Sequence, residues 1–302
     1  MKIIGCNQDN VTLLTELFSE IWEFYKTFEP VFRQHPIGER RQRPFRRLDI
    51  CGITTIPIAF QMIGGQNFKQ FHKDVICRFH RKGFPDPVSY QRFIEVAPVA
   101  VTVLAMFPKF RLEMGEKTGL YVVDPTPLCV CENIRIPRHE VFKGFAGRGK
   151  TSIGWFYGFE LHPVINHPGE LMSVNITAGN IDDRKPVSRM AKRLRGKLSG
   201  DKGYISKVPT KELYEQGLEF ITTIKKNMKQ NLSVSNRILL RKRAIIETAN
   251  DLSKNYFQIE HSRHRSMAGF MNNVFSASVA YTFYTNKPEM RGLAMQYAVI
   301  TK

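Results

Sequence analysis

The sequence predicts an α/β protein with a mixed sheet and flanking helices, preceded by a mainly helical N-terminal region. In the first third of the chain, apolar residues recur at intervals of three and four, which is typical of amphipathic helices. From about residue 113 onward, short apolar runs bounded by turns alternate with helical stretches. A chain of 302 residues can form two units. We expect a helical region at 1–112 and an α/β domain at 113–302.

The N-terminal region is expected to hold several short helices. The first has one apolar face, made of Leu13, Leu14, Leu17, Phe18, Ile21 and Trp22. An arginine-rich break follows at 40–47, and further helical segments are expected around Phe68, Phe71, Val75 and Phe79, and at 90–107. Because Pro57 and Gly64-Gly65 interrupt this half, we expect its helices to be short. The phenylalanines are interpreted as core residues, with stacking on bases as the less favoured alternative.

The second region begins with strands. Gly119–Asp124 is a short apolar run that ends in an acid, and two extended runs at 155–165 and 170–176 flank an Asn-His-Pro-Gly turn, which indicates a hairpin. Asp182 is placed to cap a helix that runs through Val187 and Met190. The remaining elements expected are a helix at 211–217, a strand at 218–224, a long helix at 238–254 and another at 266–283.

The charge of the chain indicates a polyanionic partner. Lys and Arg number 45 against 27 Asp and Glu, a formal net charge of +18. The excess is concentrated, because residues 184–243 carry 17 basic and 4 acidic residues, whereas residues 1–110 carry 15 and 10. A tract of this density repels itself unless phosphates or counterions neutralise it. A merely solvated surface is the alternative.

The N-terminus and the cysteines argue against secretion and against a membrane location. The first residues lack an apolar signal core, and the longest apolar stretch, 96–107, is too short to span a bilayer and contains Pro98. The five cysteines form an odd, scattered set, of which only Cys129 and Cys131 are close together. One such pair is a poor zinc site. We therefore expect reduced thiols in a cytoplasmic protein.

Three acids stand out as candidate metal ligands. Asp124 ends an apolar strand, Asp201 lies between Gly200 and the Lys-Gly that follows it, and Glu247 lies on a helix with basic residues one turn away. Acids from separate elements repel one another unless a cation holds them together. Two divalent ions with oxygen ligands can carry out phosphodiester displacement. Each acid alone also has a structural interpretation: a turn, support of a glycine loop, or pairing of Glu247 with Arg243.

The segments around these acids resemble the DDE transposases of bacterial insertion sequences, and in particular the insertion-sequence nine-eighty-two family. Tyr121–Leu128 is similar to the first-aspartate strand and Gly200–Ser206 to the second-aspartate loop. Arg243, Glu247 and Lys254 fit the spacing of the glutamate helix, and the segments 154–162 and 259–266 add to the likeness. The chain departs from the wider group at Leu240, where a tyrosine is common, and at Pro125, where a serine is usual.

This resemblance implies a ribonuclease-H-like catalytic domain behind a helical DNA-binding region. It implies hydrolysis at transposon ends and attack of the freed 3′-hydroxyl on target DNA, with two Mg²⁺ ions, replaceable by Mn²⁺, held by Asp124, Asp201 and Glu247. Double-stranded DNA, as terminal inverted repeats and as target, is the expected partner of a homodimer associated with the bacterial nucleoid. The residues expected to contact DNA are Arg243, Lys254, Lys202, Arg148 and Lys150.

Other functions remain open at this stage. A DNA-binding regulator or an inactivated transposase would need none of the three acids, and a nuclease of the same fold would use them without joining strands. Residues 144–151 match the phosphate-loop spacing G-x-x-x-x-G-K-T. Their context is wrong, because a proline-containing polar segment precedes them and an aromatic, glycine-broken segment follows. We interpret them as a basic connection that touches DNA. His261 and His264 are interpreted as phosphate contacts or a helix cap.

Overall fold

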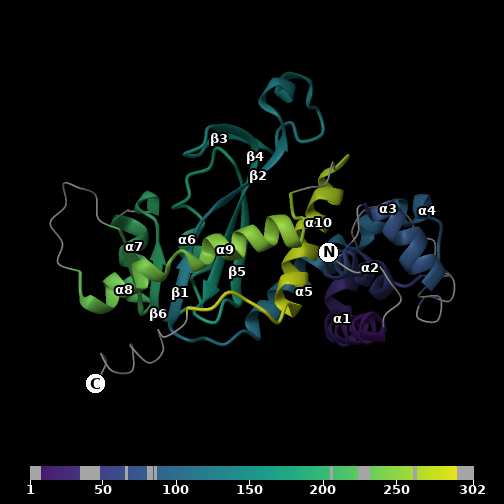
Figure 1. Cartoon of the computed structure of the whole chain (residues 1–302), viewed down its shortest axis with the longest axis horizontal. Helices are drawn as coiled ribbons and strands as arrows, with labels where there is room; N and C mark the ends of the chain where they lie inside the picture. Colours follow the sequence, from purple (N-terminus) through teal and green to yellow (C-terminus); the bar gives the residue numbers. More distant parts are fainter. Residues whose placement is uncertain are drawn as a thin grey trace. The chain divides into compact units, whose positions relative to one another are not determined.

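The computed structural model describes residues 8–34, 48–64, 67–79, 84, 87–204, 207–223, 232–260 and 264–290 (Figure 1). The chain forms two compact units. Unit 1 comprises residues 1–111 and 256–283, and unit 2 comprises residues 112–255 and 284–302. The sequence-based boundary at 112 lies beside the change from unit 1 to unit 2, but residues 256–283 return to unit 1, which the sequence does not predict.

Unit 1 is helical. Its elements are α1 (Gln8–Gln34), α2 (Ile50–Ile63), α3 (Phe68–Gln70), the π-helix η1 (Phe71–Phe79), α4 (Tyr90–Val96), the 3-10 helix η2 (Ala97–Ala100), α5 (Val101–Glu113, the last two residues being in unit 2) and α10 (Met267–Phe283). The predicted apolar face of α1 buries Leu17 and Ile21 completely. The phenylalanine stripe is core, as predicted: Phe71 is buried and packs edge-on against Phe60. The Phe79 side chain lies outside the described residues.

The helices of unit 1 are longer than the sequence predicts. Pro57 lies inside α2 without ending it, whereas Gly64 does end it, with φ 85° and a hydrogen bond from its N–H to the Phe60 carbonyl. A glycine adopts this left-handed conformation at little cost. Residues Tyr90–Glu113 form one helical run that is long and apolar enough, by length and composition, to cross a membrane. The core helix of a soluble protein passes the same test, and Leu104 and Phe107 of this run are completely buried.

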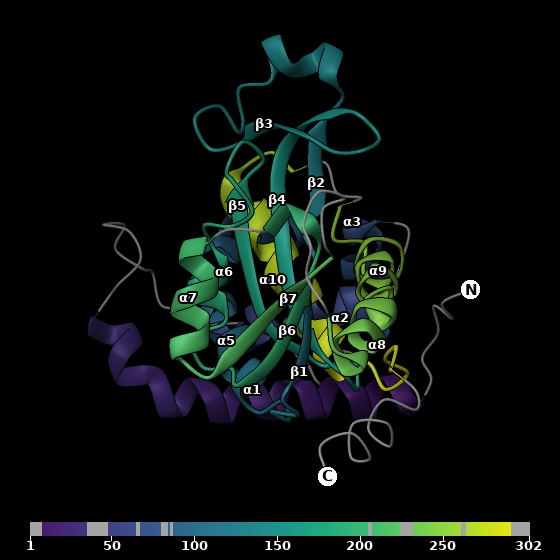
Figure 2. The same cartoon turned by 90° about the vertical axis from the view of Figure 1, so that its left-hand side faces the viewer.

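Unit 2 is built on a seven-stranded mixed sheet with the order β2-β4-β1-β6-β7, to which β5 and β3 add by pairing with β4 (Figure 2). The strands are β1 (Leu120–Val123), β2 (Thr126–Cys131), β3 (Gly147–Lys150), β4 (Trp155–Asn166), β5 (Leu171–Ala178), β6 (Gly196–Gly200) and β7 (Leu218–Thr222). The antiparallel β4–β5 hairpin is confirmed. β1 pairs antiparallel with β4 and parallel with β6, and β6 is parallel with β7. This is the mixed sheet that the sequence predicts.

Helices cover the two faces of this sheet. On one side lie α6 (Val187–Met190) and α7 (Lys207–Glu215), and on the other α8 (Val234–Lys242) and α9 (Ile245–Asp251) (Figure 2). Beneath α6 and α7 a core forms around the fully buried Tyr121, Leu198 and Leu213. A mixed sheet with flanking helices, preceded by a helical region, is the α/β architecture that the sequence predicts. The 3-10 helices η3 (Asn133–Arg138) and η4 (Lys202–Tyr204) lie in the connections.

Two local predictions in these connections are wrong, and the phosphate loop that the sequence context argues against is absent. Asp182 does not cap α6, whose first residue follows Pro186 without a side-chain cap; instead Asp182 pairs with Arg184 in the preceding turn. The basic segment at 147–150 is a strand rather than a loose connection, because its backbone pairs with β4. The next regular element after it is β4, not a helix, so the phosphate-loop interpretation fails on its structural requirement.

The predicted long helix at 238–254 is also divided. α8 ends at Lys242, α9 begins at Ile245, and the π-helix η5 (Leu252–Tyr256) follows. Between α8 and α9 the backbone tightens, since the N–H groups of Ile246 and Glu247 bond to carbonyls three residues earlier. Arg243 therefore lies at the junction after α8, and Glu247 lies in α9, rather than both lying on one continuous helix.

Candidate active site

Asp124 and Asp201 follow two strands that lie side by side. β1 and β6 are parallel neighbours in register, with Val122 opposite Ser199. Two residues further along, the same register sets Asp124 against Asp201. Because the carboxyl ends of parallel strands meet at one edge of a sheet, both acids emerge at the same edge. Each acid directly follows the buried end of a strand, so the sheet fixes the backbone before the acid but not the backbone after it.

Arg243 connects this edge to the helices. It donates a hydrogen bond from Nη1 to Oδ1 of Asp124 at 3.0 Å, across 119 residues of sequence. Its other terminal nitrogen lies 4.0 Å from Oε1 of Glu247. Asp124 and Arg243 are each about four-fifths buried, whereas the Glu247 side chain is 65% exposed. The guanidinium of Arg243 thus lies between Asp124 and Glu247.

The Asp124 carboxyl has a perturbed acidity. Burial raises its pKa from 3.8 to about 6. Arg243 acts in the opposite direction, while the negative charges of Asp201, Glu247 and Asp183 raise the pKa further. The three predicted acids are therefore close enough to influence one another, and their mutual repulsion is only partly offset by one arginine.

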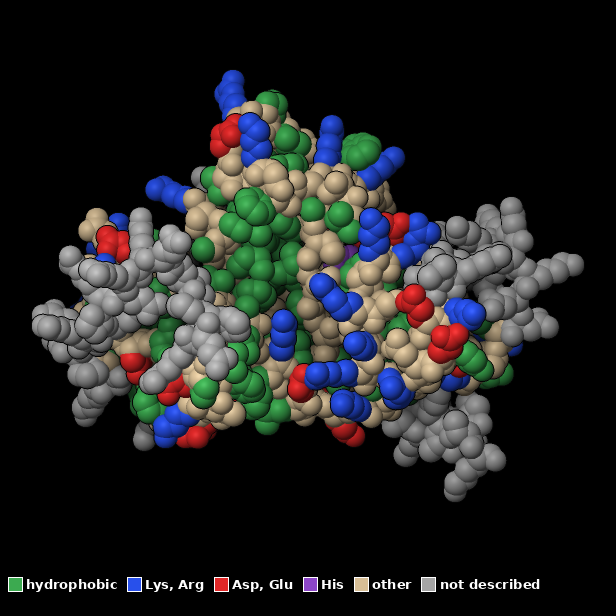
Figure 3. All heavy atoms as spheres, turned by 180° about the vertical axis from the view of Figure 1, so that it is seen from behind, with side chains coloured by type: hydrophobic (Ala, Val, Ile, Leu, Met, Phe, Trp, Pro, Cys, Tyr) green, Lys and Arg blue, Asp and Glu red, His purple; other side chains and the backbone are tan. Residues whose placement is uncertain are grey.

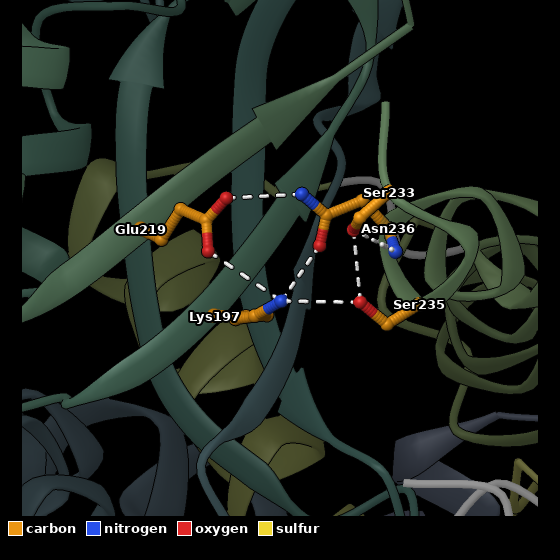
Figure 4. Close-up of polar contacts among 5 residues, drawn as sticks. All are labelled: Lys197, Glu219, Ser233, Ser235 and Asn236. Carbon is orange, nitrogen blue, oxygen red and sulfur yellow. Dashed lines mark hydrogen bonds and ion pairs between the residues drawn. The ribbon is translucent and has the colours of Figure 1, made fainter. Parts of the chain in front are cut away.

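A polar network fixes α8 against the sheet (Figure 4). Lys197 on β6 donates from Nζ to Oδ1 of Asn236 at 2.7 Å and lies 3.5 Å from Oε2 of Glu219 on β7. Asn236 in turn donates from Nδ2 to Oε1 of Glu219 at 3.0 Å. Ser233 caps α8 by accepting from the Asn236 N–H at 3.2 Å, and it contacts Ser235. Because α8 leads directly into Arg243 and α9, this network helps to hold in place the segment that carries Arg243 and Glu247.

The other predicted DNA-contacting residues lie in different places. Arg148 and Lys150 are exposed on β3, with their cationic groups 5.0 and 5.5 Å from the ring of the half-exposed Trp155. Lys254 lies in η5 and is partly buried. Lys202 follows Asp201 directly at the start of η4, and its side chain lies outside the described residues. Figure 3 shows one face of the molecule, on which exposed Lys and Arg side chains are scattered among hydrophobic and uncharged polar ones.

The donor set at the strand edge suits a divalent cation. Three carboxylates offer the oxygen ligands that Mg²⁺ and Mn²⁺ prefer, although among the described residues their ligand atoms do not all lie within 4.8 Å of one another. Burial is the main cause of the raised pKa of Asp124, and the neighbouring acids add negative charge that a cation would offset. Two of the residues, Asp201 and Glu247, remain accessible to solvent, so a substrate can approach. Arg243 occupies the space between Asp124 and Glu247.

A second acidic group was not predicted from the sequence. Glu160 and His162 on β4, together with Asp183 in the loop after β5, have ligand atoms that all lie within 4.8 Å of one another. It is the one such group of three in the part of the chain that the structure describes. Burial and a hydrogen bond with Asp183 raise the pKa of Glu160 to about 8, and burial lowers the pKa of His162. The spacing Glu-x-His on a strand was the available signal, because it places both side chains on one face.

His264 does not fit its predicted role. Burial lowers its pKa to about 4, so its ring is neutral at pH 7 and presents no cation to a phosphate. It packs edge-on against Phe270, and the N-terminal cap of α10 is Ser266, which accepts from the Gly269 N–H. His261 lies outside the described residues.

Comparison with known families matches the domain that holds these acids. The family described as "Transposase DDE domain" matches residues 114–267, just over half of the 302 residues. The chain belongs to the DDE transposase family. The matched range contains Asp124, Asp201 and Glu247, and also both acids of the second group.

Several solved chains are similar to this transposase, and one of them aligns over most of its length. It is the cryo-EM structure of a piggyBac transposase synaptic complex with hairpin DNA, with 12% sequence identity and a TM-score of 0.43, covering 93% of this chain and 77% of that chain. No curated protein matches the chain. The family assignment therefore depends on the match of the transposase DDE domain.

Proposed function

We propose that this transposase cuts DNA at the ends of a mobile element and joins the freed 3′-hydroxyl to target DNA, with Asp124, Asp201 and Glu247 as the metal-binding catalytic acids. The observation that carries the proposal is the meeting of Asp124 and Asp201 at one sheet edge, with Arg243 between Asp124 and Glu247. A regulator that only binds DNA has no need of this arrangement.

The acids would hold two Mg²⁺ ions, or Mn²⁺ in their place. Such ions lower the pKa of an attacking water or hydroxyl and offset charge on the leaving oxygen. The protein's own contribution is to hold the ligands in place: the paired strands fix Asp124 and Asp201, and the α8–α9 turn fixes Glu247. Arg243 steadies Asp124 in its ionised form, because its charge lowers the pKa of that carboxyl.

The basic surface would hold the DNA backbone. Of the tract at 184–243, Arg184, Lys185, Arg189, Lys192, Arg193, Arg195, Lys211, Arg237, Arg241 and Lys242 have exposed side chains. Arg148 and Lys150 add two more cations on β3, and Lys254 and Lys202 flank the acids in sequence. Contacts with phosphates position a duplex without reading its sequence. We place DNA along this surface with its scissile phosphate at Asp124 and Asp201.

The wider setting follows from the same resemblance. We propose that the element is of the insertion-sequence nine-eighty-two type, that its terminal inverted repeats are the DNA bound, and that two copies of the chain act together on two ends. We also propose that the protein works in the bacterial cytoplasm on nucleoid DNA, and that unit 1 contributes to DNA binding.

Cleavage of DNA that carries the inverted repeats flanking the gene tests the proposal. The full-length protein is incubated with this DNA in Mg²⁺ or in EDTA, and nicked and joined products are separated on a denaturing gel. Asp201→Asn should reduce cleavage on the order of 10³-fold, because a lost metal ligand costs several kcal/mol of transition-state stabilisation. Asp251→Asn, an exposed acid at the end of α9, is the matched control and should cleave normally.

The outcomes separate the alternative functions. Tight binding of the repeats without cleavage at any Mg²⁺ or Mn²⁺ concentration would favour a regulator or an inactivated transposase. Cleavage without joined products would favour a nuclease of the same fold. Cleavage by Asp201→Asn at the normal rate would contradict the assignment of the acids.

A further inference from the structure

Glu160, His162 and Asp183 converge beneath the loop that joins β5 to α6. Glu160 and His162 are two residues apart on β4 and so project from the same face of the sheet, the face on which Val164 joins the core under α6 and α7. Both are buried, with 9% and 0% of their surface exposed, and Asp183 is partly buried. The ligand atoms of all three lie within 4.8 Å of one another. A buried acid on a sheet is costly unless a partner compensates it.

The hydrogen bonds of His162 leave one ring nitrogen without a partner. Its Nε2 lies 2.8 Å from Oγ1 of Thr177 on β5, the strand that pairs with β4. Its Nδ1 is buried and has no hydrogen-bond partner among the described residues. A histidine that ligates a metal is commonly oriented in this way, since the second nitrogen donates to a fixed acceptor and leaves the first with a free lone pair.

A second buried polar atom lies beside the same acids. The Tyr204 hydroxyl has no hydrogen-bond partner in the part of the chain that the structure describes, although Tyr204 is 2% exposed. Its charged neighbours are Asp183, Asp124, Glu160 and Asp201, so it lies near acids of both groups. Unpaired buried polar atoms are few in folded proteins and indicate a missing ion or water. Of the two unpaired atoms, Nδ1 of His162 belongs to the cluster of ligand side chains itself.

We propose that Glu160, His162 and Asp183 bind a divalent transition-metal ion of the Zn²⁺ class at a site separate from the three catalytic acids. Two carboxylates and one imidazole form a ligand set that Zn²⁺, Co²⁺ and Mn²⁺ accept, with donors about 2 Å from the ion. The ion would replace the hydrogen bond between the two carboxyls and tie the loop after β5 to β4. This site does not depend on the proposed DNA chemistry.

Binding of Co²⁺ by the full-length protein tests the site. We use the variant Asp124→Asn/Asp201→Asn/Glu247→Gln, so that the catalytic acids contribute no binding, and follow the visible d–d absorption of Co²⁺. We expect one Co²⁺ per chain with bands from oxygen and nitrogen ligands and no thiolate charge-transfer band, which separates this site from Cys129 and Cys131. Zn²⁺ should displace the Co²⁺, and a large excess of Mg²⁺ should not.

Substitutions in the same background identify the ligands. Asp183→Asn and Glu160→Gln should each weaken Co²⁺ binding at least about tenfold. Asp182→Asn is the matched control, because Asp182 is the neighbouring acid and pairs with Arg184 instead. A melting curve in EDTA shows that each variant is folded. Equal Co²⁺ affinity in Asp183→Asn and Asp182→Asn, or a thiolate band in place of the expected spectrum, would overturn the proposal. Because the catalytic acids are already removed, this result is independent of any failure to detect DNA cleavage.

Discussion

The two groups of acids in unit 2 differ in burial and in the residues that accompany them. Asp124 and Asp201 follow the ends of two parallel strands, and Arg243 contacts Asp124 and lies 4.0 Å from the largely exposed Glu247. Glu160, His162 and Asp183 lie on the face of the sheet beneath the loop before α6, where Glu160 and Asp183 share a hydrogen bond and a histidine completes the group. We call Asp124, Asp201 and Glu247 the open group, because solvent-accessible carboxylates beside basic side chains suit a phosphodiester substrate. We call Glu160, His162 and Asp183 the closed group, because buried ligands that include an imidazole suit an ion that stays bound.

Among substitutions that leave Asp124, Asp201 and Glu247 in place, removal of Arg243 should have the largest effect on cleavage. Arg243→Met leaves Asp124 buried among other acids, so its pKa rises above about 6 and it binds a cation poorly at neutral pH. We expect cleavage at pH 7 to fall roughly 10–100-fold, as is usual when the partner of a metal ligand is lost. The measurement is the cleavage rate against pH, whose acidic limb should move to higher pH.

The neighbouring Arg241 gives a matched control for this variant. Arg241 is exposed on α8, and Arg241→Met should leave the pH profile of cleavage unchanged. If the acidic limb of Arg243→Met stays where it is in the wild type, Arg243 does not act through Asp124.

Ionisation of Glu160 in the closed group should make the thermal stability of the protein depend on pH. The Glu160 pKa is raised from 4.5 to about 8, so its contribution to stability is fully present below its unfolded pKa and is lost as pH rises through about 8. Glu160→Gln cannot ionise but can still donate to Asp183. In EDTA at pH 9 its Tm should exceed that of the wild type by several degrees, since each kcal/mol shifts Tm by about 2–4 °C in a domain of this size.

Differential scanning calorimetry from pH 5 to pH 9 checks this expectation. The Tm difference should be small at pH 5 and grow with pH, whereas Glu132→Gln, an exposed acid, should follow the wild type throughout. Parallel curves for Glu160→Gln and the wild type would mean that the buried carboxyl does not ionise in this range.

The smallest effect is expected from the network that positions α8. Lys197→Met removes the bonds to Asn236 and Glu219, each worth about 0.5–1.5 kcal/mol, and should lower cleavage about 2–10-fold. Because Lys197 would act through Glu247, the Mg²⁺ concentration for half-maximal cleavage should rise, while Co²⁺ binding at the closed group stays unchanged.

Exposed Lys117, in the loop before β1, provides the comparison. Lys117→Met should match the wild type in cleavage and in Mg²⁺ requirement. A Lys197→Met protein whose rate falls equally at all Mg²⁺ concentrations would show a general structural role rather than a positioning role.

Much of unit 2 is predictable from local pattern. The apolar run before Asp124 predicts a buried strand with an acid at its end, and the turn at 166–169 predicts the β4–β5 hairpin. These predictions hold because a strand followed by a turn is recognisable within about ten residues. β2 and β3 were not foreseen, since neither has a distinctive apolar pattern and both form by pairing with β4.

The sequence by itself determined the family, the three acids as candidates and the class of fold, because each depends on residue types at short spacing. Only the tertiary structure decided that Asp124 bonds to Arg243, that α10 packs into unit 1, and that Asp183 meets two residues of β4. Such contacts join residues about 20 to 120 positions apart. They depend on how strands pair and how loops cross the sheet, and the free energy that selects one pairing over another comes from the whole buried core rather than from any short segment.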